Sequence, residues 1–236
     1  MTLDELVSQL RAAYGDGLRC VVLYGSAAGG EHIKNRSDYN VLVIADSLAP
    51  ETLRAASAVS RAWHEAGNPA PLTLTTSEWR GSADIFPMEY ADILERHRVL
   101  HGQSPFDGIR VDVRDLRLQL EREAMGKLLR LRQGVLASGG DAKRQLELLT
   151  ASVSAILVIF RALIRLHAST PPADNVALSE AAARIGRFDA EPFARVVRHV
   201  RSEAKLSGDD APAVLAGYLH GVEQLVAYLN RYEPNG

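Results

Sequence analysis

Residues 21–45 read VVLYGSAAGGEHIKNRSDYNVLVIA. The stretch begins with a short apolar run that ends at Gly25 and Ser26, and it closes with a second apolar run at residues 41–45. Short β-branched runs bounded by glycine and polar residues are typical of adjacent buried strands. Small and polar residues between the runs allow the chain to bend tightly and expose its backbone N–H groups. The stretch therefore predicts two neighbouring strands joined by a polar connection.

Two oxygen-bearing side chains stand where the second strand begins. Asp38 and Asn40 are separated by one residue, so the alternation of a strand places them on the same face. The turn at Gly25 and Ser26 precedes them, and the backbone N–H groups of such a turn are suited to holding a phosphate. We therefore expect an anion-binding turn next to Asp38.

At these residues the sequence resembles the nucleotidyltransferases of the DNA polymerase β-like superfamily, and in layout most of all the aminoglycoside nucleotidyltransferases. Their signature is a hydrophobic strand, Gly-Ser, a loop, and then Asp-x-Asp or Asp-x-Glu in a strand; here 11 residues separate Ser26 from Asp38. The resemblance implies that carboxylates bind a pair of Mg²⁺ ions and that the Gly-Ser turn holds the triphosphate of ATP or another NTP. It also implies that a nucleoside monophosphate passes to a hydroxyl group of a small molecule or a protein.

The resemblance assigns roles to particular positions of this chain. Asp38 corresponds to a catalytic metal ligand. Two cations in the loop before it can meet a triphosphate, although solvated loop charges are the alternative reading. The positions expected to bind the nucleotide are Gly25, Ser26, Lys34, Arg36 and Asn40.

The chain also departs from the family pattern. Asn40 stands where the second carboxylate belongs, and Thr73 is the expected inward position on the next strand, where the third belongs. Mg²⁺ prefers anionic oxygen ligands, so these changes weaken the predicted metal site. We expect Glu89 to substitute for the third carboxylate as a catalytic residue; Asp92 is an equally near acid, and Glu78 is a further candidate. A solvated helix start is the alternative for Glu89 and Asp92.

Composition excludes several classes of protein. The chain has 236 residues and a net charge of −2, so it lacks the basic footprint of a dedicated nucleic-acid binder. Its single cysteine, Cys20, forms no internal disulfide and reads as a small buried hydrophobe. The N-terminus lacks the order of a signal peptide, and the longest apolar run, residues 155–160, is too short to span a bilayer. We expect a cytoplasmic protein with no membrane partner.

The pattern of hydrophobic residues divides the chain in two. Residues 1–110 alternate predicted helices and strands, with a helix at 50–66 between strands as in a crossover unit. Residues 77–107 give no clear pattern apart from a turn and short helix that begin near residue 86 and run to about residue 97, and a strand at 99–102. Residues 111–236 predict helices only, at 116–137, 142–167, 179–186, 191–205 and 209–232. The predicted fold is α+β: a small mixed-sheet nucleotidyltransferase domain, then an antiparallel helical bundle.

Three functions remain open at this point. The first is Mg²⁺-dependent nucleotidyl transfer with a weakened metal site. The second is a non-catalytic relative that binds a nucleotide, a ligand or a partner. The third is a helical ribonuclease, because Arg161 and His167 resemble the loose Arg-x4–6-His pattern of the HEPN fold. The acceptor, the nucleotide preference and the oligomeric state stay open.

Overall fold

The computed structural model of the chain describes residues 1–25, 27–28 and 39–233. Contacts between Cα atoms divide it into two compact units, Met1–Val111 and Asp112–Gly236.

Unit 1 is built around a mixed four-stranded sheet in the order β3-β2-β1-β4. Strand β1 pairs antiparallel with both β2 and β4, whereas β2 and β3 are parallel and joined by α2, as the crossover prediction requires. The elements in chain order are α1 (Leu3–Tyr14), η1 (Gly15–Gly17), β1 (Leu18–Tyr24), β2 (Asn40–Ala45), α2 (Pro50–Glu65), β3 (Leu72–Thr75), α3 (Thr76–Gly81), α4 (Pro87–Glu95) and β4 (His97–Gly102).

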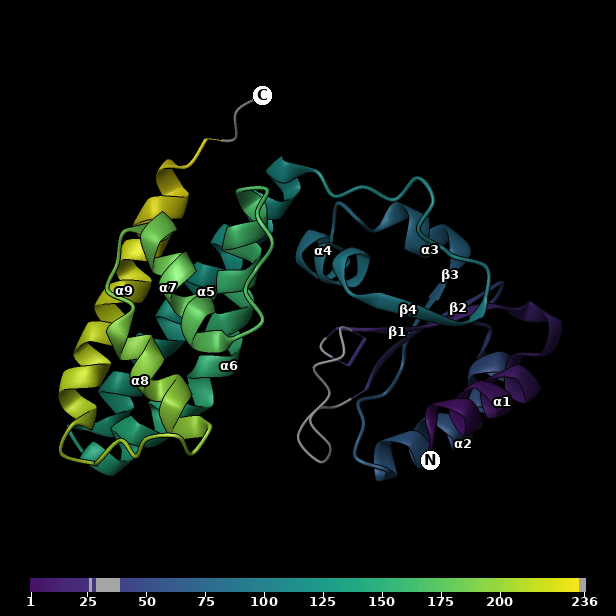
Figure 1. Cartoon of the computed structure of the whole chain (residues 1–236). Helices are drawn as coiled ribbons and strands as arrows, with labels where there is room; N and C mark the ends of the chain where they lie inside the picture. The colour runs from purple at the N-terminus through teal and green to yellow at the C-terminus, as the bar shows by residue number, and fades with distance from the viewer. Residues whose placement is uncertain (26, 29–38, 234–236) are drawn as a thin grey trace. The chain divides into compact units, whose positions relative to one another are not determined.

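Helices cover both faces of this sheet. Figure 1 shows α1 and α2 on one side of the strands and α3 and α4 on the other. Val21 and Val43 belong to the face that packs against Leu6 and Trp63 of α1 and α2. Alternate residues of the same strands form the other face and pack against a cluster centred on Trp79 of α3. Because both faces are buried, β1 and β2 are nearly continuous apolar runs.

Local sequence explains where these helices begin. Thr2 caps α1 in a capping box with Glu5, and Thr75 caps α3 in the same way with Glu78. Proline occupies the first turn of α2 and of α4, where its missing N–H costs nothing. The short helix α3 lies in the segment that the sequence pattern left unassigned. Its six residues are held by Trp79, which is 1% exposed, because a helix this short depends on tertiary packing.

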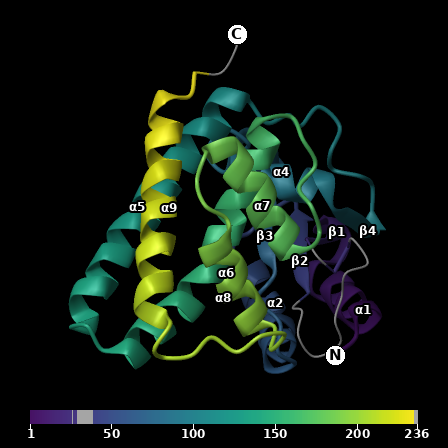
Figure 2. The same ribbon diagram turned by 60° about the vertical axis from the view of Figure 1, so that its left-hand side comes forward.

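Unit 2 is an all-helical bundle among the described residues. Figure 2 shows α9 running beside α5, and the two helices are in contact. Helix α7 begins four residues earlier than the sequence pattern predicts, because Asp174 caps it through the N–H groups of Val176 and Ala177. The helices are α5 (Val113–Ser138), α6 (Ala142–Leu166), α7 (Asn175–Gly186), α8 (Glu191–Val200) and α9 (Ala211–Arg231).

Helix α6 is the central element of this bundle. It contacts α5, α7, α8 and α9, and its buried side chains include Phe160, Leu163 and Leu149. Within the described part of the chain, α6 is the one helix that is long and apolar enough to cross a bilayer by length and composition alone. Half of that apolar stretch is buried inside the bundle, which is what the core helix of a bundle requires.

Candidate functional site

The turn after β1 and the start of β2 meet at one end of the sheet. Tyr24 pairs with Asn40 in the antiparallel register, so Gly25 follows directly beside Asn40. A Cβ atom at Gly25 would lie 3.5 Å from Asn40 Nδ2. Gly25 has a φ of +77°, which favours glycine, and Ala28 N–H donates to its carbonyl across the turn. The predicted approach of this turn to position 40 is therefore present.

A carboxylate from α4 faces the same point. Asp92 Oδ2 lies 3.8 Å from the position of a Cβ atom at Gly25. Its other oxygen, Oδ1, accepts a hydrogen bond of 2.9 Å from Arg96 Nη2, one helical turn later. Arg96 also accepts the N–H of Gly25 on its backbone carbonyl, at 3.0 Å. Asp92 is thus fixed by one oxygen and directs the other toward Gly25 and Asn40.

The two acids of α4 differ in position. Both Asp92 and Glu89 raise the pKa of Tyr24, after the larger effect of burial, so both carboxylates lie near the end of β1. Glu89 is exposed in the first turn of α4, whereas the Asp92 side chain is only 29% exposed and touches the strand ends. The structure therefore brings Asp92 to the expected site and leaves Glu89 one helical turn away.

Thr73 does not occupy the inward position expected for the third carboxylate. It pairs with Val43, whose side chain belongs to the face covered by α1 and α2, and it hydrogen-bonds to Tyr14 of α1. Asn40 alternates with Leu42 and therefore lies on the opposite face. The β3 positions on that face are Leu72 and Leu74, which are apolar. The prediction that Thr73 faces the site was wrong. The observed register of β3 against β2 differs by one residue from the one that would place Thr73 there, and a difference of one residue puts a side chain on the opposite face of the sheet.

The Glu78 carboxylate is hydrogen-bonded to Thr75 at the start of α3. Its Oε2 accepts the Thr75 N–H at 2.7 Å and the Thr75 hydroxyl at 2.9 Å. These hydrogen bonds to the cap lower the pKa of Glu78. Glu78 is therefore a capping residue of α3.

Four predicted site residues lie outside the described residues: Ser26, Lys34, Arg36 and Asp38. Among the residues that are described, no group of three or more His, Cys, Asp or Glu side chains could hold a metal ion. The described end of the sheet supplies one carboxylate oxygen, from Asp92, and the amide of Asn40. Arg96 was not identified from the sequence, although its spacing of four residues from Asp92 on a predicted helix was a signal for an ion pair.

The HEPN-like pair in unit 2 has separate partners. Arg161 Nη2 donates to Asn175 Oδ1 at 2.8 Å. His167 Nε2 lies 2.7 Å from the Tyr228 hydroxyl, and the ring of Tyr232 packs against it. Burial lowers the pKa of His167. These contacts give both residues a place in the packing of the bundle.

Comparisons with known proteins point to a fold. No protein-family model matches the sequence, and no curated protein matches it. Nine chains of solved structures match. One is spectinomycin adenyltransferase AAD(9) from Enterococcus faecialis, crystallised with ATP and spectinomycin. It aligns with a TM-score of 0.62 at 12% identity and covers 97% of this chain and 98% of that one. The chain therefore has a nucleotidyltransferase-like α+β fold.

Proposed function

We propose that this chain, which has a nucleotidyltransferase-like fold, binds a nucleoside triphosphate at the Gly25 and Asn40 end of its sheet. There it transfers a nucleoside monophosphate to a hydroxyl group of a small molecule or a protein. The observation that carries the proposal is the meeting of Gly25, Asn40 and Asp92 Oδ2 at that end. AAD(9) was crystallised with ATP and a small molecule, spectinomycin, which supports a nucleotide and a small-molecule acceptor.

The proposal assigns the metal-binding role to two acids. Asp38 is the first carboxylate ligand, and Asp92 replaces the missing third one. Asn40 adds a neutral oxygen. Mg²⁺ requires anionic oxygens in octahedral geometry, so this donor set fits one ion and not the pair that the family resemblance implies. When bound, Mg²⁺ would offset the charge of the triphosphate.

Other residues of the chain are proposed to position Asp92 and to contact the phosphates. Arg96 holds Asp92 in one rotamer through the ion pair at 2.9 Å. Lys34 and Arg36 are proposed to contact the phosphates. The N–H of Gly25 already donates to Arg96, so Gly25 contributes close backbone approach, and Ser26 is proposed to contribute the phosphate-binding group.

A non-catalytic nucleotide-binding protein is the second candidate. Asn40 and the apolar Leu72 and Leu74 favour it, because they leave fewer anionic ligands than two-metal catalysis needs. Arg96 favours it as well, since its charge opposes a cation at Asp92. Turnover separates the two candidates, whereas nucleotide binding is common to both.

Calorimetry with a non-hydrolysable ATP analogue and Mg²⁺ tests binding. We expect Mg²⁺-dependent binding that weakens about tenfold or more in Asp38→Ala and in Asp92→Asn, since each loses a charged ligand. Asp4→Asn, an exposed change on α1, is the matched control and retains the affinity of the unaltered chain. If Asp92→Asn binds the nucleotide as tightly as the control does, Asp92 is not a ligand of the site.

Pyrophosphate release from ATP in the presence of candidate acceptors, spectinomycin among them, tests transfer. Release that is lost in Asp38→Ala supports the enzyme. Binding without release from any of the four common NTPs supports the non-catalytic candidate. Release that survives Asp38→Ala refutes the assignment of Asp38, and the absence of metal-dependent nucleotide binding rejects both candidates.

A further inference from the structure

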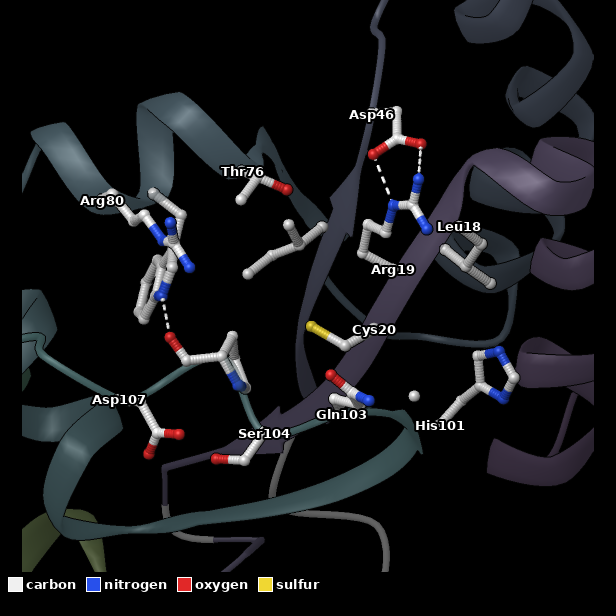
Figure 3. A pocket seen from close by; sticks show the side chains of 14 residues that line it. Leu18, Arg19, Cys20, Asp46, Thr76, Arg80, His101, Gln103, Ser104 and Asp107 are labelled. Atoms are coloured by element: carbon white, nitrogen blue, oxygen red, sulfur yellow. Dashed lines mark hydrogen bonds and ion pairs between the residues drawn. The ribbon is translucent and has the colours of Figure 1, made fainter.

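Unit 1 contains a second hollow, at the other end of its sheet. It is bounded by the start of β1, the end of β2, α3 and residues 101–107, with a volume of about 690 Å³. Figure 3 shows the side chains of Thr76, Arg80 and Cys20 directed into the space between α3 and the strands. Strand β1 runs from Leu18 at this pocket to the turn at Gly25, a distance of roughly 20 Å at the rise of a strand. A molecule bound here would not overlap with a nucleotide at Gly25.

The walls of this far-end pocket are fixed by internal contacts. The indole N–H of Trp79 donates to the carbonyl of Pro105 at 2.8 Å, and the Tyr90 hydroxyl donates to the carbonyl of Trp79 at 2.7 Å. Gly102 has a φ of +80°, and a Cβ atom there would lie 1.9 Å from the carbonyl oxygen of Arg19. The backbone of β4 therefore closes tightly onto β1 and holds the following segment in place. Such a pocket is formed before a ligand arrives, which reduces the entropy lost on binding.

Polar side chains without a partner gather around this pocket. Those that have no hydrogen bond or ion pair to any described residue are Thr76, Arg80, His101, Gln103, Ser104 and Asp107. The polar side chains of α3 that do not line the pocket behave differently, since Ser77 and Glu78 are both bonded to Thr75. Thr76 and Arg80 are four residues apart and so share one side of the helix. Arg80, Gln103, Ser104 and Asp107 are exposed, so these groups are hydrated in the free protein and available to a ligand that replaces the water.

The charges around the pocket define the chemistry of a ligand. Arg19 and Asp46 form a two-point ion pair and cancel each other. Arg80 remains as a guanidinium able to bind an acid with paired hydrogen bonds. Asp107 remains as an acceptor for hydroxyl groups, and its negative charge opposes a polyanion such as a triphosphate. The Cys20 thiol is neutral, because burial raises its pKa to about 11.

We propose that the far-end pocket binds a small polyhydroxylated molecule that carries a single acidic group. Arg80 binds the acid, and Asp107, Gln103 and Ser104 bind the hydroxyl groups. This site is independent of the proposed nucleotide site.

Two-dimensional ¹⁵N NMR of the full chain tests the proposal with three probes: D-glucuronate, D-glucose 6-phosphate and D-glucose. We expect D-glucuronate or D-glucose 6-phosphate to shift the amide signals of Cys20 and of residues 101–107, while those of Gly25 and Asn40 stay in place. Whichever of the two binds more tightly identifies the acid as carboxylate or phosphate. D-glucose binds at least about tenfold more weakly, since it lacks the charge-assisted contact to Arg80.

Matched variants complete the test. Arg80→Gln keeps the length of the side chain and removes its charge, so its affinity for the acidic probe falls about tenfold or more. Arg61→Gln changes an exposed arginine of α2, on the opposite face of the sheet, and leaves the affinity unchanged. The proposal is overturned if neither acidic probe shifts the amides at millimolar concentration. It is equally overturned if D-glucose binds as tightly as the acids, or if Arg80→Gln binds like Arg61→Gln.

Discussion

Gly102 ends β4 beside the backbone of Arg19 in β1. Its φ of +80° lies in the left-handed region, and its α-carbon has no room for a side chain beside the carbonyl of Arg19. Gly108 has almost the same φ, +79°, yet nothing lies within 4 Å of a Cβ atom built there. The two glycines therefore separate the effect of backbone conformation from the effect of a steric clash.

Alanine at these two positions is expected to give different losses of stability. Gly108→Ala costs about 1–2 kcal/mol for the left-handed backbone alone. Gly102→Ala adds the clash with Arg19 O and costs about 3 kcal/mol or more. Urea unfolding followed by tryptophan fluorescence measures this in unit 1, because both tryptophans of the chain, Trp63 and Trp79, are buried there. Equal losses in the two variants would contradict the clash.

At the scale of elements, α4 decides which acid reaches the strand ends. The helix begins at Pro87 and ends against Gly25, whose N–H is bonded to Arg96, the residue that caps α4. This contact places the second turn of α4, and not its first, beside Asn40. Asp92 is therefore the acid at the site because of where the helix ends.

The contact between α6 and α9 leads us to expect that the stability of unit 2 depends on pH. His167 ends α6 and its Nε2 meets the Tyr228 hydroxyl of α9, in surroundings where burial lowers its pKa below the usual 6.5. The unfolded chain binds a proton at His167 that the folded chain does not, so stability is full above pH 6.5 and falls as the pH drops toward the folded pKa. Solvent screening reduces this loss, because the His167 ring is only partly buried.

Chemical unfolding followed by far-UV circular dichroism at pH 7.5 and 5.5 measures this loss. In His167→Phe the ring still packs on Tyr232 but does not titrate, so we expect most of the pH dependence to disappear. His220 is exposed on α9, and His220→Phe is the control that retains the pH dependence of the unaltered chain. A pH dependence that persists unchanged in His167→Phe would show that other groups cause it.

At the scale of the whole molecule, each unit has its own core. The clusters of unit 1 lie on the two faces of its sheet, and α6 provides the centre of unit 2. Domains with separate cores fold as separate units when they are expressed alone. We expect a fragment of residues 1–111 and a fragment of residues 112–236 each to unfold cooperatively in urea and to give a dispersed NMR spectrum. An unfolded fragment would show that the division by contacts does not mark an independent domain.

The sequence by itself determined the fold class and most of the regular elements. Residues 21–45 predicted adjacent strands, and the crossover through α2 followed from a helix between two strands. The long helices of unit 2 were predicted because an amphipathic stripe of many residues is a strong local signal. The helix α3 escaped prediction, since its stability comes from the packing of Trp79.

Tertiary structure alone decided which side chains meet. The register of β3 turned Thr73 away from Asn40, and the end of α4 brought Asp92 and not Glu89 to Gly25. The far-end pocket brings Arg80 together with residues 103–107, which follow β4 and lie more than 20 positions after Arg80 in the sequence. Hydrophobic periodicity is a local property that a sequence displays directly. The position of one polar side chain against another depends on strand register and helix packing, which arise only when distant segments of the chain come together.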